Sequence, residues 1–184
     1  EGTTDYSQHP CGSSDVYCPE GSDSPILVPD GFISGPLSAN STNRYVIIAC
    51  PLGHYCVSGI MNECPPGTYG NVGLSSPLCS GLCPKGYYCP SGTVSFEEYP
   101  CSNGHYGSEI GLWNSTCSGS CLSGYYCPPS STNSTSIPCG NAQVYCPSGS
   151  DSPLLVPSGW CSGPIESDPS TRSEIFFPDP HHLC

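Results

Sequence analysis

Residues 64–92 read CPPGTYGNVGLSSPLCSGLCPKGYYCPSG, and residues 101–130 read CSNGHYGSEIGLWNSTCSGSCLSGYYCPPS. Four cysteines of the first stretch recur 37 or 38 residues later, together with a Gly-x-Tyr-Gly motif. The recurring cysteines are Cys64, Cys79, Cys83 and Cys89 in the first stretch and Cys101, Cys117, Cys121 and Cys127 in the second. Such self-similarity is typical of repeat architecture, in which one unit is too small to bury a face alone.

A longer repeat encloses the first. Val16–Gly31 (VYCPEGSDSPILVPDG) returns as Val144–Gly159 (VYCPSGSDSPLLVPSG), displaced by 128 residues. Farther along, Arg44 corresponds to Arg172 and Cys56 to Cys184. The sequence therefore predicts a lead-in at 1–63, one repeat at 64–100, a second at 101–138, and the start of a second super-repeat at 139–184. The lead-in contains two cysteine cassettes, by which we mean pairs of cysteines six or seven residues apart. We expect such a pattern either to belong to a longer array or to continue into the next subunit.

Cysteine stands in for a large hydrophobic core. The 184 residues include 22 Gly, 22 Pro and 16 Cys, but only 4 Phe, 2 Trp and 1 Met. Each disulfide contributes roughly 2–4 kcal/mol, so eight of them can replace a missing core. Zinc is disfavoured, because no C-x2-C pair occurs. The predicted fold is a set of small disulfide-rich repeats, forming an elongated rod of short β-hairpins and irregular loops with almost no helix.

The spacing favours local pairing of the cysteines. Five short cassettes recur, at Cys11/Cys18, Cys50/Cys56, Cys83/Cys89, Cys121/Cys127 and Cys139/Cys146. The remaining six then give Cys64–Cys79, Cys101–Cys117 and Cys161–Cys184. In the last pair Cys161 replaces Ile33 of the first copy, while Pro178 replaces Cys50, as a rewired bond requires. Spacing does not determine pairing, and bonding of Cys83 or Cys89 to a cysteine of the next repeat stays open.

Regular secondary structure is expected to be sparse, because Gly or Pro interrupts nearly every segment. Short strands, paired as small hairpins, are predicted at Tyr45–Ala49, Gly86–Cys89 and Gly124–Cys127. Two apolar runs bracketed by prolines, Ile26–Val28 and Leu154–Val156, are expected to be plugs packed against a disulfide and not sheet members.

The chain has the features of an extracellular or cell-surface glycoprotein. Disulfides persist outside the cytosol. Three Asn-Ser-Thr sequons, at Asn40, Asn114 and Asn133, predict N-linked glycans. The net charge of −12 excludes a nucleic-acid partner, which requires a basic surface, and disfavours direct binding to anionic lipid. No apolar run approaches the ~18 residues of a membrane span.

Catalytic and metal sites find little support in the sequence. An even, repeat-organised set of cysteines leaves no obvious free thiol, and no G-x-S-x-G motif occurs. We therefore expect no enzyme activity, no cofactor and no metal. His181-His182 with Asp179 and Cys184 is interpreted as a solvated tail. Asp23 and Asp151, in matching Gly-Ser-Asp-Ser-Pro motifs, are interpreted as turn caps in preference to calcium ligands.

The tyrosine pairs of the two repeats admit two interpretations. Tyr87-Tyr88 and Tyr125-Tyr126 occupy corresponding positions. They could form a recognition stripe, since aromatic side chains dominate many interfaces. We expect them instead to pack over the disulfides and supply the small cores of the repeats.

The motif of residues 64–92, with its cysteine, glycine and tyrosine positions, resembles the cysteine-rich repeats of ephrin receptors. Similar repeats are strung into large secreted or surface proteins of protists and algae. The resemblance implies an elongated rod of small disulfide knots but no particular ligand. We expect an extracellular structural glycoprotein, a subunit or segment of a filament, appendage or surface coat, that self-associates. The alternative is an adhesin or receptor ectodomain that binds a protein or glycan.

Overall fold

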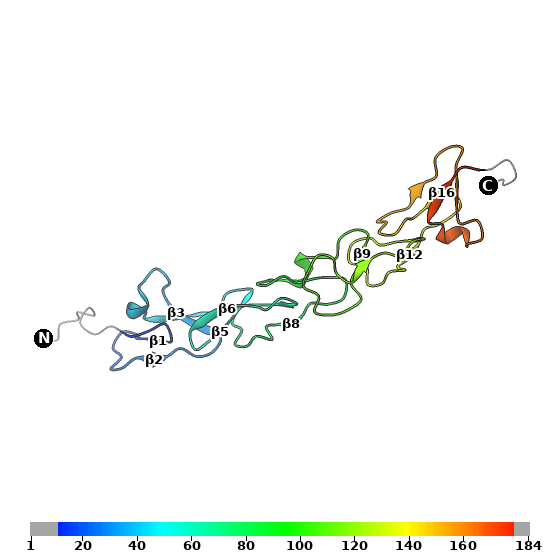
Figure 1. Ribbon diagram of the computed structural model, residues 1–184. Helices are drawn as coiled ribbons and strands as arrows, with labels where there is room; N and C mark the ends of the chain where they lie inside the picture. The colour runs from blue at the N-terminus through cyan, green and yellow to red at the C-terminus, as the bar shows by residue number, and fades with distance from the viewer. Residues whose placement is uncertain (1–10, 179–184) are drawn as a thin grey trace. The chain divides into compact units, whose positions relative to one another are not determined.

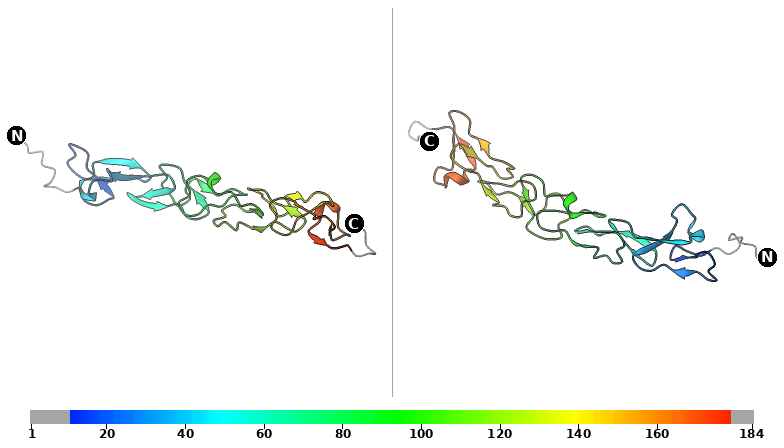
Figure 2. Two further views of the ribbon diagram at one scale, coloured as in Figure 1. Left: turned by 90° about the horizontal axis from the view of Figure 1, so that it is seen from above. Right: turned by 180° about the vertical axis from the view of Figure 1, so that it is seen from behind.

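The computed structural model describes residues 11–178, and these residues form only short elements joined by loops (Figure 1). Every sheet among them is an antiparallel pair of strands, and no strand is longer than four residues. The helical structure among these residues consists of three 3-10 turns of three residues each. They are η2 (Ser41–Asn43), η3 (Phe96–Glu98) and η4 (Pro169–Thr171). The two further views show the same short arrows and long loops (Figure 2). The predicted class, a small disulfide-rich hairpin fold with almost no helix, is confirmed.

The chain divides into two compact units, Glu1–Leu82 with Pro90–Ser95, and Cys83–Cys89 with Phe96–Cys184. The first unit contains four hairpins. They pair β1 (Val16–Tyr17) with β2 (Ile26–Leu27), β3 (Phe32–Gly35) with β4 (Val46–Ala49), β5 (His54–Val57) with β6 (Ile60–Glu63), and β7 (Thr68–Tyr69) with β8 (Gly81–Leu82).

The second unit also contains four hairpins. They pair β9 (His105–Tyr106) with β10 (Gly119–Ser120), β11 (Tyr125–Tyr126) with β12 (Ile137–Pro138), β13 (Val144–Tyr145) with β14 (Leu154–Leu155), and β15 (Cys161–Gly163) with β16 (Glu174–Phe176). The last two match β1–β2 and β3–β4 at the 128-residue displacement. The long sequence repeat is therefore a repeat of local structure.

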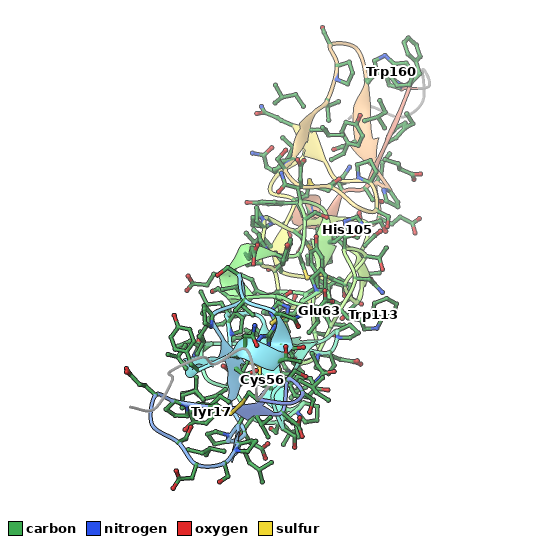
Figure 3. The ribbon with its side chains drawn as sticks, turned by 90° about the vertical axis from the view of Figure 1, so that its left-hand side faces the viewer. Tyr17, Cys56, Glu63, His105, Trp113 and Trp160 are labelled. Atoms are coloured by element: carbon green, nitrogen blue, oxygen red, sulfur yellow. A yellow bond between two sulfur atoms is a disulfide. The ribbon has the colours of Figure 1, made fainter. Side chains whose placement is uncertain are left out.

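Disulfides make up most of the buried interior. Apart from cysteine, the only buried hydrophobic side chains within residues 11–178 are Val28 and Ile33. Ile33 packs with Cys50 and Cys56 in one buried cluster. Figure 3 shows Cys56 inside the hairpin of β5 and β6. The composition explains this arrangement, since the chain has few large aliphatic residues with which to build a core.

Seven disulfides join fourteen of the described cysteines. They are Cys11–Cys18, Cys50–Cys56, Cys64–Cys79, Cys83–Cys89, Cys101–Cys117, Cys121–Cys127 and Cys139–Cys146. These are the local pairs that the cassettes favour, and Cys83 and Cys89 bond to one another and not to the next repeat. Cys161 is disulfide-bonded, and its predicted partner Cys184 lies outside the described residues. So many disulfides indicate an oxidising, extracellular or secreted setting.

Of the three predicted strands, one needs correction. Tyr45–Ala49 and Gly124–Cys127 contain β4 and β11, as expected. Gly86–Cys89 forms no ladder and makes a single bridge, from Tyr87 to Pro100.

The prediction that the two proline-bracketed runs are plugs is wrong. Ile26–Leu27 is strand β2, and Leu154–Leu155 is strand β14. Each pairs in register with a Val-Tyr strand, so its backbone is used in the hairpin while its side chains face solvent. Leu27 is 72% exposed, and only Val28, the residue after the strand, is buried.

Candidate functional sites: glycine junctions and sequons

One arrangement joins successive repeats within each unit, and we call it the glycine junction. A turn glycine donates its N–H to a carbonyl of a later disulfide loop. The same glycine accepts, through its own carbonyl, the N–H of the first cysteine of that loop. At Gly104 the partners are the Cys127 carbonyl and the Cys121 N–H, both at 2.8 Å.

Five such junctions occur within residues 11–178, with N···O distances of 2.7 to 3.0 Å. Two lie in the first unit and three in the second. They join Gly31 to Cys50 and Cys56, Gly53 to Cys64 and Gly70, Gly86 to Cys101 and Gly107, Gly104 to Cys121 and Cys127, and Gly124 to Cys139 and Cys146. All five turn glycines are buried. Because the bonds involve only backbone groups, loops with different side chains can make the same junction.

The turns require glycine for two reasons. The φ of Gly104 is 76° and that of Gly124 is 85°, which is the left-handed region that side chains rarely adopt. In addition, a Cβ at Gly104 would overlap the carbonyl oxygen of Gly149, and one at Gly124 would overlap that of Thr171. The backbone of the following repeat therefore packs directly on the turn.

These junctions were not predicted from the sequence, although a signal was present. Four of the five turn glycines stand three residues after a cysteine, in Cys-x-x-Gly: Cys50–Gly53, Cys83–Gly86, Cys101–Gly104 and Cys121–Gly124. That spacing marks a tight turn after each disulfide cysteine. It does not reveal which later loop the turn contacts.

The two copies of the long repeat share a buried serine–arginine contact. The Arg44 guanidinium donates to the Ser34 carbonyl at 3.1 Å and to the Ser34 hydroxyl oxygen at 3.2 Å. In the second copy Arg172 donates to the Ser162 carbonyl. Both serines are buried. Two of the three basic residues of the chain are thus used inside its modules and not on a basic surface.

The three sequons share one local geometry. In each, the side-chain carbonyl oxygen of the asparagine accepts the backbone N–H of the threonine two residues later, at 3.4 Å for Asn40, 3.1 Å for Asn114 and 3.0 Å for Asn133. This is an Asx turn. Asn40 and Asn133 are exposed, and Asn114 is half-buried. The turn uses the oxygen of the amide, so the Nδ2 atom that carries an N-linked glycan lies outside this hydrogen bond.

Asn40 also caps η2, and its counterpart in the second copy is an aspartate. Asp168 caps η4, accepting the Ser170 N–H at 2.9 Å and the Ser170 hydroxyl at 3.0 Å. The pKa of Asp168 lies below its ordinary value. The hydrogen bond from the Ser170 N–H is the larger cause, and the one from the Ser170 hydroxyl is the next. The second copy thus keeps the cap and loses the sequon.

The matching aspartates of the Gly-Ser-Asp-Ser-Pro motifs differ in their contacts. Asp151 accepts the Ser152 hydroxyl at 3.0 Å and the Asn103 side-chain N–H at 3.4 Å. These two hydrogen bonds lower the pKa of Asp151, and the one from the Ser152 hydroxyl has the larger effect. No group of three His, Cys, Asp or Glu side chains that could hold a metal ion occurs within the described chain. His181, His182, Asp179 and Cys184 lie outside the described residues.

The paired tyrosines are half-buried in both repeats. Tyr87 makes an edge-to-face contact with Phe96, with ring centroids 5.6 Å apart, and the ring centroid of Tyr88 lies 5.5 Å from that of Tyr99. These contacts lie within the first of the two repeats. The expected packing of the tyrosine pairs over the disulfides stays a prediction.

No helical turn among residues 11–178 has the length or apolarity to span a bilayer. No protein-family model matches the chain, and no curated protein matches its sequence. The likeness of residues 64–92 to ephrin-receptor cysteine-rich repeats therefore stays a prediction from that motif.

Proposed function

We propose that this protein is an extracellular structural glycoprotein, a subunit or segment of a filament, appendage or surface coat. The observation that carries the proposal is the glycine junction, which recurs five times with different side chains around it. A backbone device that joins one repeat to the next is suited to building length, since it can be repeated without a new side-chain solution. The proposal assigns no catalytic step and no cofactor.

The disulfides and the net charge of the surface support the same proposal. The seven described disulfides hold small units that lack a hydrophobic core and resist unfolding outside the cell. The net charge of −12 keeps the surface soluble. Glycans on Asn40, Asn114 and Asn133 would add to that solubility and shield the backbone from proteases.

Imaging of the native material by negative stain tests the proposal. We expect linear or helical polymers in the images. Where disulfides join the subunits, the protein should run at a higher mass on a non-reducing gel than on a reducing gel. The second candidate, an adhesin or receptor ectodomain, predicts dispersed single molecules that bind a protein or glycan. It rests on the exposed apolar residues, among them Trp113 and Leu155.

The glycans are tested separately, by intact mass before and after treatment with a glycosidase that removes N-linked sugar. We expect Asn40→Gln, Asn114→Gln and Asn133→Gln each to remove one glycan increment from the secreted protein. Asp168→Asn serves as the matched control, because Pro169 comes directly after it and no sequon is created. A wild-type mass that does not change with glycosidase would contradict the assignment.

A further inference from the structure

The loop that carries the Asn114 sequon, residues 111–117, has the same backbone arrangement as residues 73–79 of the first repeat. The cysteine that ends the loop has a φ of 50° in both copies. Three backbone hydrogen bonds recur, with N···O distances of 2.7 to 3.1 Å. They run from the N–H of Gly111 to Cys83, Cys89 to Leu112 and Cys117 to Asn114, and, in the first repeat, from Gly73 to Cys50, Cys56 to Leu74 and Cys79 to Ser76.

The two copies of this loop differ in the side chains that they carry. Residues 113–116 read WNST, whereas residues 75–78 read SSPL. The tryptophan and the sequon therefore occur together in the second repeat and are replaced together in the first. Because the first repeat builds the same loop with Ser75 in place of Trp113, the fold of the loop does not require a tryptophan.

Trp113 presents much of its ring to solvent. Its side chain is 59% exposed, and Figure 3 shows it at the outer edge of this repeat. Single exposed apolar residues are common on protein surfaces, so exposure alone assigns no role. Its place in the sequence does, because Trp113 comes directly before Asn114, the residue that would carry the sugar.

The asparagine amide is held in one orientation beside this ring. The Asn114 side-chain oxygen accepts the Thr116 N–H at 3.1 Å and also accepts the Thr116 hydroxyl. Consecutive Cα atoms are about 3.8 Å apart, so a sugar on the Asn114 Nδ2 atom starts within reach of the neighbouring indole. A covalently attached sugar has a high effective concentration at the ring, and even a weak contact is then well populated.

We propose that the indole face of Trp113 packs against the first sugar of the N-linked glycan on Asn114. The C–H groups on one face of that sugar would lie over the electron-rich face of the aromatic ring. The occupant is the chain's own glycan, because the ring and the attachment site are neighbours and are found in the same copy of the loop. This inference rests on the proposed function, in which Asn114 is glycosylated.

NMR of the glycosylated, disulfide-intact chain, secreted by a eukaryotic host, tests the inference. Protons that lie over the face of an indole are shifted upfield by its ring current. We expect this shift for the first sugar on Asn114, whose signals Asn114→Gln identifies. The first sugars on Asn40 and Asn133, which do not follow an aromatic residue, are the controls within the same sample. Trp113→Ser should abolish the shift and leave the control sugars unchanged.

The first repeat allows the same contact to be built on a matching backbone. Ser76→Asn, Pro77→Ser and Leu78→Thr together create a sequon there, and Ser75 and Leu78 are both exposed, which leaves room for a sugar. With Ser75→Trp added, the new first sugar should show the upfield shift. Without Ser75→Trp, its protons should resonate with those of the control sugars.

Unfolding in guanidinium with the disulfides intact gives a second measure. Trp113→Ser should lower the folding equilibrium constant by a factor about fivefold larger when Asn114 is glycosylated than in the Asn114→Gln background. If Asn114 is glycosylated by mass and the upfield shift is absent or survives Trp113→Ser, the contact is wrong and the proposed function stands. If the secreted wild type has no sugar on Asn114, the inference is overturned together with the glycan assigned to that site.

Discussion

At Gly104 the backbone of one repeat lies directly on that of the next, and a single methyl group tests the contact. Gly104→Ala must both hold a φ of 76° and displace the Gly149 carbonyl, which breaks the bonds to Cys121 and Cys127. We expect the free energy of unfolding to fall by about 3 kcal/mol, against about 1 kcal/mol for Gly73→Ala at nearly the same φ. Guanidinium unfolding with disulfides intact measures both. Equal losses would show that the junction contributes nothing beyond backbone strain.

Asp151 provides a pH-dependent measure of a second contact between repeats. Its pKa is lowered first by the Ser152 hydroxyl and then by Asn103. Because the folded pKa is lowered, the stabilising contribution of this carboxylate is present above the ordinary aspartate pKa and is lost as the pH falls through the lowered value. Ser152→Ala should raise the pKa of Asp151 in an NMR titration, and Asn103→Ala should raise it less. The reverse order would contradict the assignment of the two causes.

Among the elements, the disulfide loops differ in length, and this predicts their relative worth. Cys101–Cys117 closes a loop of sequence separation 16, and Cys121–Cys127 one of separation 6. In the chain-entropy model the longer loop contributes about 3 kcal/mol and the shorter about 2 kcal/mol. We therefore expect the double Cys→Ala variant of the longer loop to lose about 1 kcal/mol more in chemical unfolding. A larger loss from the shorter loop would mean that burial of Cys121 and Cys127 outweighs loop entropy.

The hairpins show how far pattern predicts an element. Tyr45–Ala49 was predictable as a strand, because a β-branched run between polar segments favours one. Ile26–Leu27 was misassigned, because a short apolar run bounded by prolines looks the same whether it is buried or pairs at an exposed edge. The deciding feature was its register with Val16–Tyr17, an earlier segment whose pairing hydropathy does not encode.

For the whole molecule, the disulfide map is the direct experimental check. Peptide mapping under non-reducing conditions should recover the seven local pairs and a peptide that joins Cys161 to Cys184. The replacement of Ile33 by Cys161 and of Cys50 by Pro178 predicts that last bond. A peptide that joins Cys79 to Cys89 would contradict both the Cys64–Cys79 and the Cys83–Cys89 disulfide. A free thiol at Cys184 would remove the rewiring hypothesis.

The sequence alone determined the two nested periods, the small disulfide-rich fold and the three sequons, because repeated residues and sequons are read directly from the letters. It favoured the local pairing of the cassettes without determining it, and the structure decided that Cys83 bonds to Cys89 and not to the next repeat. The tertiary structure decided the glycine junctions, which join backbone groups as distant in the chain as Gly31 and Cys56, and backbone hydrogen bonds carry no side-chain signature. It likewise distinguished the buried Gly31 from the exposed Gly159, two glycines in nearly identical stretches of sequence, because burial depends on the segment that packs against each glycine.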